Sequence, residues 1–294
     1  MGQDIQPRKG DMWEFFNEYP HVAGFTQKEA VALHAGGDLG GGRGYFREMI
    51  DLFIEALKAG RKVIDIGCGA GMPGLFVAPH VDELVGIDPA PRMLAEAREN
   101  AARLGVENIV FMEASADDLP FADGTFDGAA LCGLLESMDE RKTDEVMVET
   151  RRVLSPGARI AVAVVDWGED RQQSADRKVR VWHGEGRLMF VVVEATESPY
   201  VVKHTRYVVD PDSPTGRKLT GGLPNDNPAS TTLGPDDLAP GDILDAWHGE
   251  RVGFTRDTLT SLVASHGFGD IDTRDLQGEI FLTASKTGKS PSGR

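Results

Sequence analysis

An apolar run that ends in an acid and passes into a glycine-rich turn constrains this chain more than any other feature. The stretch from Val63 to Gly74 reads VIDIGCGAGMPG. The apolar residues predict a buried strand, and the glycines allow a tight turn in which backbone N–H groups approach a ligand without interference from Cβ atoms. A helical pattern begins directly after the turn. The sequence therefore predicts a nucleotide-like ligand at the end of a strand.

Two signatures overlap in this turn, and they predict different ligands. Residues 69–74 satisfy G-x-G-x-x-G, and Asp88 follows at about the 20 residues expected of a dinucleotide-binding fold. Residues 65–71 also form a complete D-x-G-x-G-x-G, in which Asp65 ends the strand and can hold a cationic amine. The first signature favours a nicotinamide-dependent oxidoreductase. That hypothesis explains the glycines and Asp88, but it explains neither Asp65 nor the block at 115–127.

Charge restricts the partners of the chain. Its 294 residues include 31 Lys and Arg and 47 Asp and Glu, which gives a formal net charge of −16. Such a charge repels nucleic acid phosphates and anionic membrane surfaces, so we expect neither as a partner. No apolar run approaches the roughly 20 residues that span a bilayer, and the opening MGQDIQPRKG lacks the apolar part of a signal peptide. We therefore predict a cytoplasmic protein.

The cysteine content points to a reducing compartment. Only Cys68 and Cys132 are present, too few for a disulfide scaffold. They also lack the CxxC or His-rich spacing of a metal site, so we predict no metal. Small buried thiols are the expected state of both residues.

The order of strand and helix patterns predicts an α/β fold. From residue 61 onward, short apolar runs alternate with amphipathic segments, which indicates a doubly wound, mostly parallel seven-stranded sheet with helices on both faces. The last two strands would form an antiparallel C-terminal edge hairpin. The predicted strands are 62–66, 83–87, 109–112, 126–131, 159–165, 270–274 and 279–284, and the predicted helices are 12–16, 27–35, 45–57, 73–79, 91–104, 140–154 and 255–266.

Residues 168–250 depart from this alternation. Strand patterns at 179–183, 187–194 and 200–209 predict a small antiparallel meander, and 211–240, rich in Pro, Gly, Asp and Asn, is expected to be loop. Inserted after the fifth strand, this block would lie over the carboxyl ends of the sheet, where open α/β sheets bind ligands.

The same patterns predict four parts of the chain. These are a helical N-terminal lid at 1–45, a core at 46–167 and 251–287, an inserted β-rich substrate cap at 168–250, and a disordered tail at 288–294. The glycine-rich stretch 36–44 is either a flexible connector or a hinge for the lid.

Three motifs in this order resemble those of the class I S-adenosylmethionine-dependent methyltransferases. They are the D-x-G-x-G-x-G turn, the acid Asp88 at the end of the second strand, and the block SADDLPFADGTFD from Ser115 to Asp127. The resemblance covers about residues 60–166. It implies S-adenosylmethionine as the cofactor and S-adenosylhomocysteine as the product.

The resemblance also implies roles for individual residues. Asp65 would hold the methionine amine, Asp88 the ribose hydroxyls, and the Ala116 N–H with the Asp117 side chain the adenine edge. Many relatives carry an aspartate where this chain has Ser115. The residues expected to bind the cofactor are Asp65, Gly67, Cys68, Gly69, Gly71, Asp88, Pro89, Met93, Ser115, Ala116, Asp117, Leu131 and Cys132.

The chemistry of methyl transfer limits what catalytic residues need to do. A sulfonium methyl is already activated, so transfer needs mainly an in-line nucleophile, and a general base helps if that nucleophile carries a proton. Glu136 follows the fourth strand, where relatives often place a polar residue, and a solvated acid at a helix start explains it equally well. Among the histidines we select His248, near the expected pocket mouth, and then His204, in a polar stretch.

The predicted function is methyl transfer from S-adenosylmethionine to a small-molecule acceptor, through oxygen or nitrogen, in a monomer or homodimer. A specialised metabolite would suit this chemistry. Two alternatives stay open. One is methylation of a basic peptide or protein, which the acidic composition would suit. The other is a non-catalytic subunit that binds the cofactor without turnover.

Overall fold

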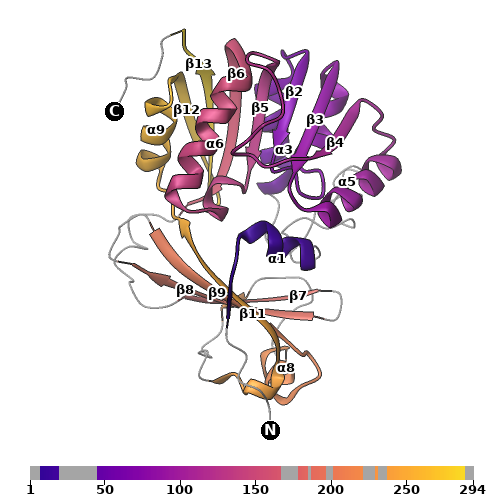
Figure 1. The fold of residues 1–294 in the computed structure, drawn as a ribbon, viewed down its shortest axis with the longest axis vertical. Coiled ribbons are helices and arrows are strands. Elements are labelled where there is room, and N and C mark those ends of the chain that lie inside the picture. The colour runs from indigo at the N-terminus through magenta and orange to yellow at the C-terminus, as the bar shows by residue number, and fades with distance from the viewer. Residues whose placement is uncertain are drawn as a thin grey trace. The chain divides into compact units, whose positions relative to one another are not determined.

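The computed structural model describes residues 7–19, 45–166, 178–184, 187–196, 201–220, 229–230 and 237–288. The chain splits into two compact units (Figure 1). Phe25–Glu169 and Val252–Arg294 form the larger unit. Met1–Gly24 and Asp170–Arg251 form the smaller unit, so the N-terminal residues belong to the same unit as the inserted block.

The larger unit contains a seven-stranded sheet in the order β12-β13-β6-β5-β2-β3-β4. Strands β4, β3, β2, β5 and β6 are parallel, whereas β13 pairs antiparallel with both β6 and β12. The predicted fold class, a mostly parallel sheet with an antiparallel C-terminal hairpin, is therefore confirmed. The strands are β2 (Lys62–Ile66), β3 (Glu83–Asp88), β4 (Ile109–Glu113), β5 (Phe126–Cys132), β6 (Leu154–Val165), β12 (Phe268–Leu276) and β13 (Glu279–Lys286).

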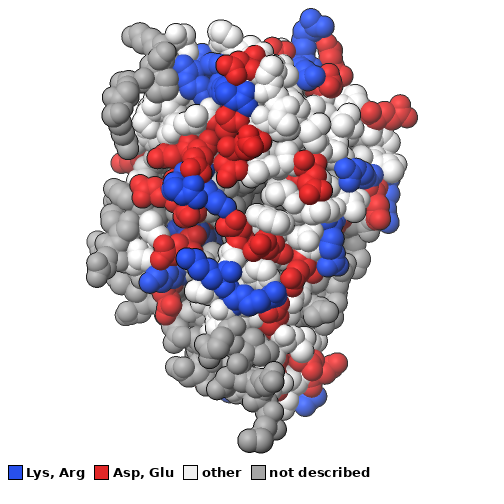
Figure 2. Space-filling view, in the orientation of Figure 1, with Lys and Arg blue, Asp and Glu red and all other residues white. Residues whose placement is uncertain are grey.

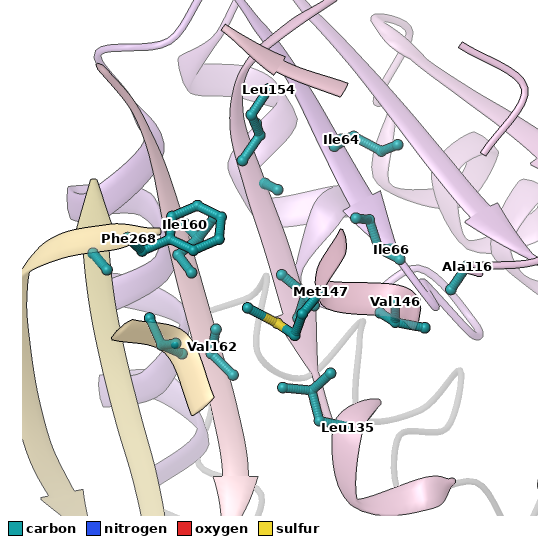
Figure 3. Close-up of a cluster of buried hydrophobic side chains, with 14 of the residues drawn as sticks. Ile64, Ile66, Ala116, Leu135, Val146, Met147, Leu154, Ile160, Val162 and Phe268 are labelled. Carbon is teal, nitrogen blue, oxygen red and sulfur yellow. The ribbon is translucent and has the colours of Figure 1, made fainter. Parts of the chain in front are cut away.

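Helices cover both faces of this sheet, as the continuous apolar runs of its central strands require. On one face, Ile64, Met147 of α6 and Leu259 of α9 belong to one buried cluster, part of which is drawn in Figure 3. On the other face, Val63 packs with Phe53 of α3. The helices of this unit are α3 (Tyr45–Leu57), α4 (Gly74–Val77), α5 (Pro91–Leu104), α6 (Glu140–Val153) and α9 (Arg256–Ser265), with short 3-10 turns η2 (Ala78–His80) and η3 (Leu135–Ser137).

The start of β6 differs from the prediction. The sequence places a turn at 155–157 and a strand from 159, but β6 begins at Leu154, directly after α6. Leu154 pairs with Phe126, and the register then shifts between Phe126 and Gly128. Gly157, with a φ of 80°, provides the left-handed backbone in this irregular stretch.

The smaller unit contains a six-stranded sheet in the order β1-β11-β9-β8-β7-β10. The predicted meander is present, because β8 pairs antiparallel with β7 and with β9. β1 pairs parallel with β11 at the other side of the sheet. The elements are β1 (Arg8–Lys9), α1 (Met12–Glu18), β7 (Lys178–Gly184), β8 (Arg187–Ala195), β9 (Val201–Val209), α8 (Pro214–Thr220), β10 (Ala229–Ser230), η5 (Pro240–Asp242) and β11 (Ile243–Val252).

Several elements of the smaller unit are absent from the sequence prediction, among them the short strands β1 and β10. The stretch 211–240, expected to be loop, contains helix α8, whose Leu219 packs with Leu238 over Phe190 and Val209. The stretch from Ile243 onward forms strand β11. The predicted helix at 27–35 and the glycine-rich stretch 36–44 lie outside the described residues, as does most of the predicted disordered tail at 288–294.

Charged side chains of both signs are interspersed on the face drawn in Figure 2. Exposed pairs such as Arg141–Glu145 and Arg61–Asp82 contribute little to stability, because water and salt screen them. None of the described helices combines the length and the apolar composition that crossing a membrane would require.

Candidate functional site

The glycine turn joins the carboxyl end of β2 to helix α4. Gly67, Gly69 and Gly71 have φ values of 69°, 50° and 104°, a region that side-chain-bearing residues rarely adopt. Space is also restricted, because a Cβ at Gly67 would lie 2.7 Å from Leu134 Cδ1, and one at Gly71 would lie 2.7 Å from Leu75 Cδ1. Glycine is therefore required here by both conformation and packing.

Asp65 lies beneath this turn and is only partly satisfied. Its Oδ2 accepts a hydrogen bond from the Gly74 backbone N–H at 2.9 Å. Its Oδ1 is buried and has no hydrogen-bond partner among the described residues. Burial raises the pKa of Asp65 to about 7, although the Gly74 hydrogen bond lowers it and the Asp88 charge raises it. A buried carboxylate oxygen in this state fits a cationic donor.

Asp88 fixes the turn to the neighbouring strand. Its Oδ2 accepts from the Gly69 N–H and its Oδ1 from the Ala90 N–H, each at 2.9 Å. β2 and β3 are parallel neighbours, so Asp65 and Asp88 come to the same edge of the sheet. Burial raises the pKa of Asp88, and the two backbone hydrogen bonds lower it.

Asn100 supports the same turn, and the sequence reasoning missed it. Its Nδ2 donates to the Ala70 carbonyl at 3.0 Å, and the side chain is 1% exposed. Asn100 shares the buried face of α5 with Met93 and Ala97. The sequence alone could have indicated Asn100, because this polar residue interrupts an otherwise apolar stripe along the predicted helix.

The remaining predicted cofactor residues border this turn or follow neighbouring strands. Met93 is buried, and its Cε would lie 3.3 Å from a Cβ at Gly69. After β4, Ala116 is buried, and the Ser115 hydroxyl donates to Asp117 Oδ1. Pro89, which follows β3, is half-buried.

Leu131 and the two thiols are also buried or nearly so. Leu131 lies at the end of β5, which is the parallel neighbour of β2. Cys68 and Cys132 are free, and burial raises the pKa of each thiol well above its ordinary value. Both are therefore protonated at neutral pH and inert as nucleophiles.

Glu136 is buried, which excludes the interpretation as a solvated acid. It lies on the turn η3 after β5, is 5% exposed, and its Oε1 accepts from the Val165 N–H at 3.2 Å. Leu134, two residues before Glu136, lies against Gly67 of the glycine turn, because a Cβ at Gly67 would lie 2.7 Å from its Cδ1. The segment that carries Glu136 therefore borders the turn.

The two predicted catalytic histidines belong to the smaller unit. His248 is exposed on β11 and pairs in register with Lys9 of β1. His204 is 4% exposed on β9. Burial, together with smaller contributions from the positive charges of Arg206 and Arg251 and from His248, lowers the pKa of His204 to about 2. An imidazole with this pKa is a very weak general base.

The donors and acceptors of the turn fit S-adenosylmethionine. The buried Oδ1 of Asp65 matches a primary ammonium, and the glycine backbone allows an aminoacyl chain to approach closely. Among the described residues, no group of three or more His, Cys, Asp or Glu side chains is arranged to hold a metal ion.

Comparisons with known proteins agree with this site. Residues 63–157 match the family model described as a methyltransferase domain. The O-methyltransferase resE of Aspergillus sclerotiorum is 37% identical over 110 residues, which are 36% of this chain and 40% of that protein. The chain thus spans less than half the length of this curated relative.

Two solved structures share the fold over most of the chain. One is CalS10, an amino pentose methyltransferase from Micromonospora echinaspora, with a TM-score of 0.53, 18% identity, and coverage of 90% of this chain and 98% of that chain. The other is the [4+2]-cyclase SpnF, with a TM-score of 0.55, 18% identity, and coverage of 96% and 98%. At these identities the likeness concerns the fold alone.

The sheet order, the glycine turn between two carboxylates, and the match at 63–157 define one class of protein. The chain carries a class I S-adenosylmethionine-dependent methyltransferase domain.

Proposed function

We propose that this protein transfers a methyl group from S-adenosylmethionine to a small-molecule acceptor, with oxygen or nitrogen as the accepting atom. The observation that carries the proposal is the buried Oδ1 of Asp65, which has no hydrogen-bond partner among the described residues and lies under a turn built for close backbone approach. The likeness to an O-methyltransferase favours oxygen.

Residues of the larger unit would hold the cofactor in a defined order. Asp65 would accept a hydrogen bond from the amine, and Gly67, Gly69 and Gly71 would admit the aminoacyl chain. Each oxygen of Asp88 already accepts one backbone hydrogen bond and retains capacity for a ribose hydroxyl.

The adenine would lie between residues of three neighbouring segments. Pro89 and Met93 would flank the ring, and the Ala116 N–H and the Asp117 carboxylate would bind its edge. The Ser115 hydroxyl donates to Asp117 and so orients the carboxylate. We propose that this hydrogen bond compensates for the aspartate that many relatives carry at 115.

S-adenosylmethionine supplies a methyl group on a positively charged sulfur. The protein then needs to hold the acceptor atom in line and to receive its proton. We propose Glu136 as the first candidate to receive that proton, because it is buried and follows Leu134, whose side chain borders Gly67 of the turn. His248 is the second candidate, since it is exposed and free to meet a ligand.

Calorimetric titration of the whole protein with S-adenosylmethionine tests the binding step. We expect saturable binding that Asp65→Asn weakens, whereas Asp82→Asn, a matched change at an exposed carboxylate, leaves it unchanged. NADH serves as the competing ligand, and binding of NADH in place of S-adenosylmethionine would overturn the proposal.

Formation of S-adenosylhomocysteine with a panel of hydroxylated, amino and peptide acceptors tests the transfer step. Product with small molecules supports the proposal, and product with peptides alone would support the protein methyltransferase. Binding without any product would support a role outside methyl transfer. The cyclase SpnF illustrates that this fold hosts other chemistry.

A further inference from the structure

Two basic side chains are buried side by side in the smaller unit. Arg206 and His204 lie two residues apart on β9, so their side chains share one face of the sheet. Arg206 is 8% exposed and His204 is 4% exposed. Among the described residues, neither Arg206 Nε nor His204 Nδ1 has a hydrogen-bond partner. Buried polar atoms in this state are rare and call for an explanation.

Helix α1 supplies the surroundings of the Arg206 guanidinium. The sulfur of Met12 accepts a hydrogen bond from Arg206 Nη1. The guanidinium carbon lies 5.3 Å from the centre of the Phe15 ring and 5.9 Å from that of Phe16. These contacts involve a weak acceptor and two ring faces, and none is with an anion.

Several other arginines among the described residues have carboxylate partners. Arg8 pairs with Glu18 and Asp245 in the same unit, and Arg152 pairs with Glu149 in the larger unit. No ion pair among the described residues includes Arg206. Burial and, to a smaller extent, the Arg251 charge lower the pKa of Arg206 to about 9. The described residues supply no carboxylate that pairs with the Arg206 guanidinium.

A purely structural role for Arg206 explains only part of this arrangement. Packing against Phe15 and Phe16 accounts for the guanidinium faces, but it leaves Nε without an acceptor. It also gives no reason for a second buried basic residue next to it. Gly249 on the neighbouring strand β11 adds a further observation, because a Cβ there would lie 3.2 Å from the His204 ring. The glycine at 249 thus lets the backbone of β11 approach the imidazole closely.

We propose that Arg206 and His204 form a binding site for a small molecule with an anionic group, a carboxylate or a phosphate. An oxyanion would accept hydrogen bonds from Arg206 Nε and from the N–H of His204, and it would neutralise the buried charge. The site is formed by residues of the smaller unit alone, so it goes beyond the proposed function and does not depend on it.

The test follows the imidazole signals of His204 by NMR in the full-length protein. Acetate, phosphate and chloride are titrated at constant ionic strength, and His204→Gln identifies the signal. We expect saturable shifts with acetate or phosphate and none with chloride. Arg206→Met should weaken this binding at least about tenfold, as loss of a charged hydrogen bond predicts. Lys218→Gln makes the same charge change at an exposed site on α8 and should leave the binding unchanged.

Each outcome bears on the proposal. A response to phosphate alone identifies a phosphoryl ligand, and a response to acetate identifies a carboxylate. Equal shifts with chloride, or equal shifts in wild type and Arg206→Met, would overturn the site. If Arg206→Met does not fold, Arg206→Lys keeps the charge and removes Nε, and undiminished binding to that variant overturns the site as well.

Calorimetry with S-adenosylmethionine on the same samples separates the two proposals. Anion binding without cofactor binding contradicts the proposed function and leaves the anion site standing. Cofactor binding without an anion response contradicts the anion site alone.

Discussion

Ionisation of Asp65 has opposite effects on cofactor binding and on the stability of the ligand-free fold. Burial raises its pKa to about 7, far above the value of about 3.9 in an unfolded chain. The carboxylate must be ionised to accept an ammonium group. Protonation instead favours the ligand-free fold, because it removes a buried charge.

We expect the affinity for S-adenosylmethionine to fall roughly five- to tenfold from about pH 7.5 to about pH 6, as Asp65 becomes protonated. The contribution of Asp65 to the free energy of unfolding has the opposite sign. Its folded pKa exceeds its unfolded pKa, so this contribution is fully present below about pH 4 and is lost as pH rises through about 7.

Calorimetry at both pH values and thermal unfolding of the ligand-free protein measure these two effects. Asp65→Asn should reduce both pH dependences, and the exposed substitution Asp82→Asn should leave both intact. A cofactor affinity that is equal at the two pH values would contradict the role of Asp65.

At the scale of single residues, the sequence predicted the carboxylates and glycines of the turn because their spacing forms a motif. It did not predict Asn100, whose hydrogen bond to Ala70 depends on how α5 packs against the turn. It also did not predict that Glu136 is buried, since burial at that position depends on β6, which supplies the Val165 N–H.

At the scale of elements, the spacing of apolar residues predicted the helices and strands whose own sequences show a helical or strand period. The central strands β2 and β3 are short and mostly buried, with their apolar residues close together, and α5 begins with Pro91 and ends before Gly105 in the left-handed region. In contrast, β11 interrupts its apolar residues with charges and a glycine, and it forms a strand because β9 and β1 pair with it. Helix α8 contains both Pro and Gly, and the burial of Leu219 stabilises it.

Helix α9 offers a test of a predicted helix end. The Thr255 hydroxyl accepts a hydrogen bond from the Thr258 N–H, and the Thr258 side chain accepts from the Thr255 N–H. We expect Thr255→Ala to lower the free energy of unfolding by about 1 kcal/mol, because it leaves a helix N–H unsatisfied. Chemical denaturation measures this change.

Thr260→Ala is the matched control within the same helix. It removes the same side chain from an interior position, where alanine has the higher helix propensity, so stability should stay equal or rise by a few tenths of a kcal/mol. Equal losses from both substitutions would contradict the capping role of Thr255.

At the scale of the whole molecule, the two compact units divide the proposed tasks. Cofactor residues lie in the larger unit, and the buried basic pair lies in the smaller one. We expect S-adenosylmethionine to slow amide hydrogen exchange mainly at 65–74 and 88–93 in the larger unit, because those backbone groups border the turn.

Mass spectrometry of exchanged peptides measures this protection. Phosphate or acetate, added without the cofactor, should instead protect peptides of β9 and α1 around Arg206. Protection of the smaller unit alone by S-adenosylmethionine would contradict the assignment of the cofactor to the larger unit.

The pairing of β1 with β11 has a consequence for biosynthesis. The Arg8 side chain donates a hydrogen bond to Asp245, which lies 237 residues later in the chain. Strand β1 is translated long before its partner β11. In the interval most strands of the larger unit are translated, and β1 has no native strand to pair with. Slower translation after residue 252 would therefore give β1 and β11 time to pair. A chaperone that binds the segment around β1 would help the smaller unit to fold.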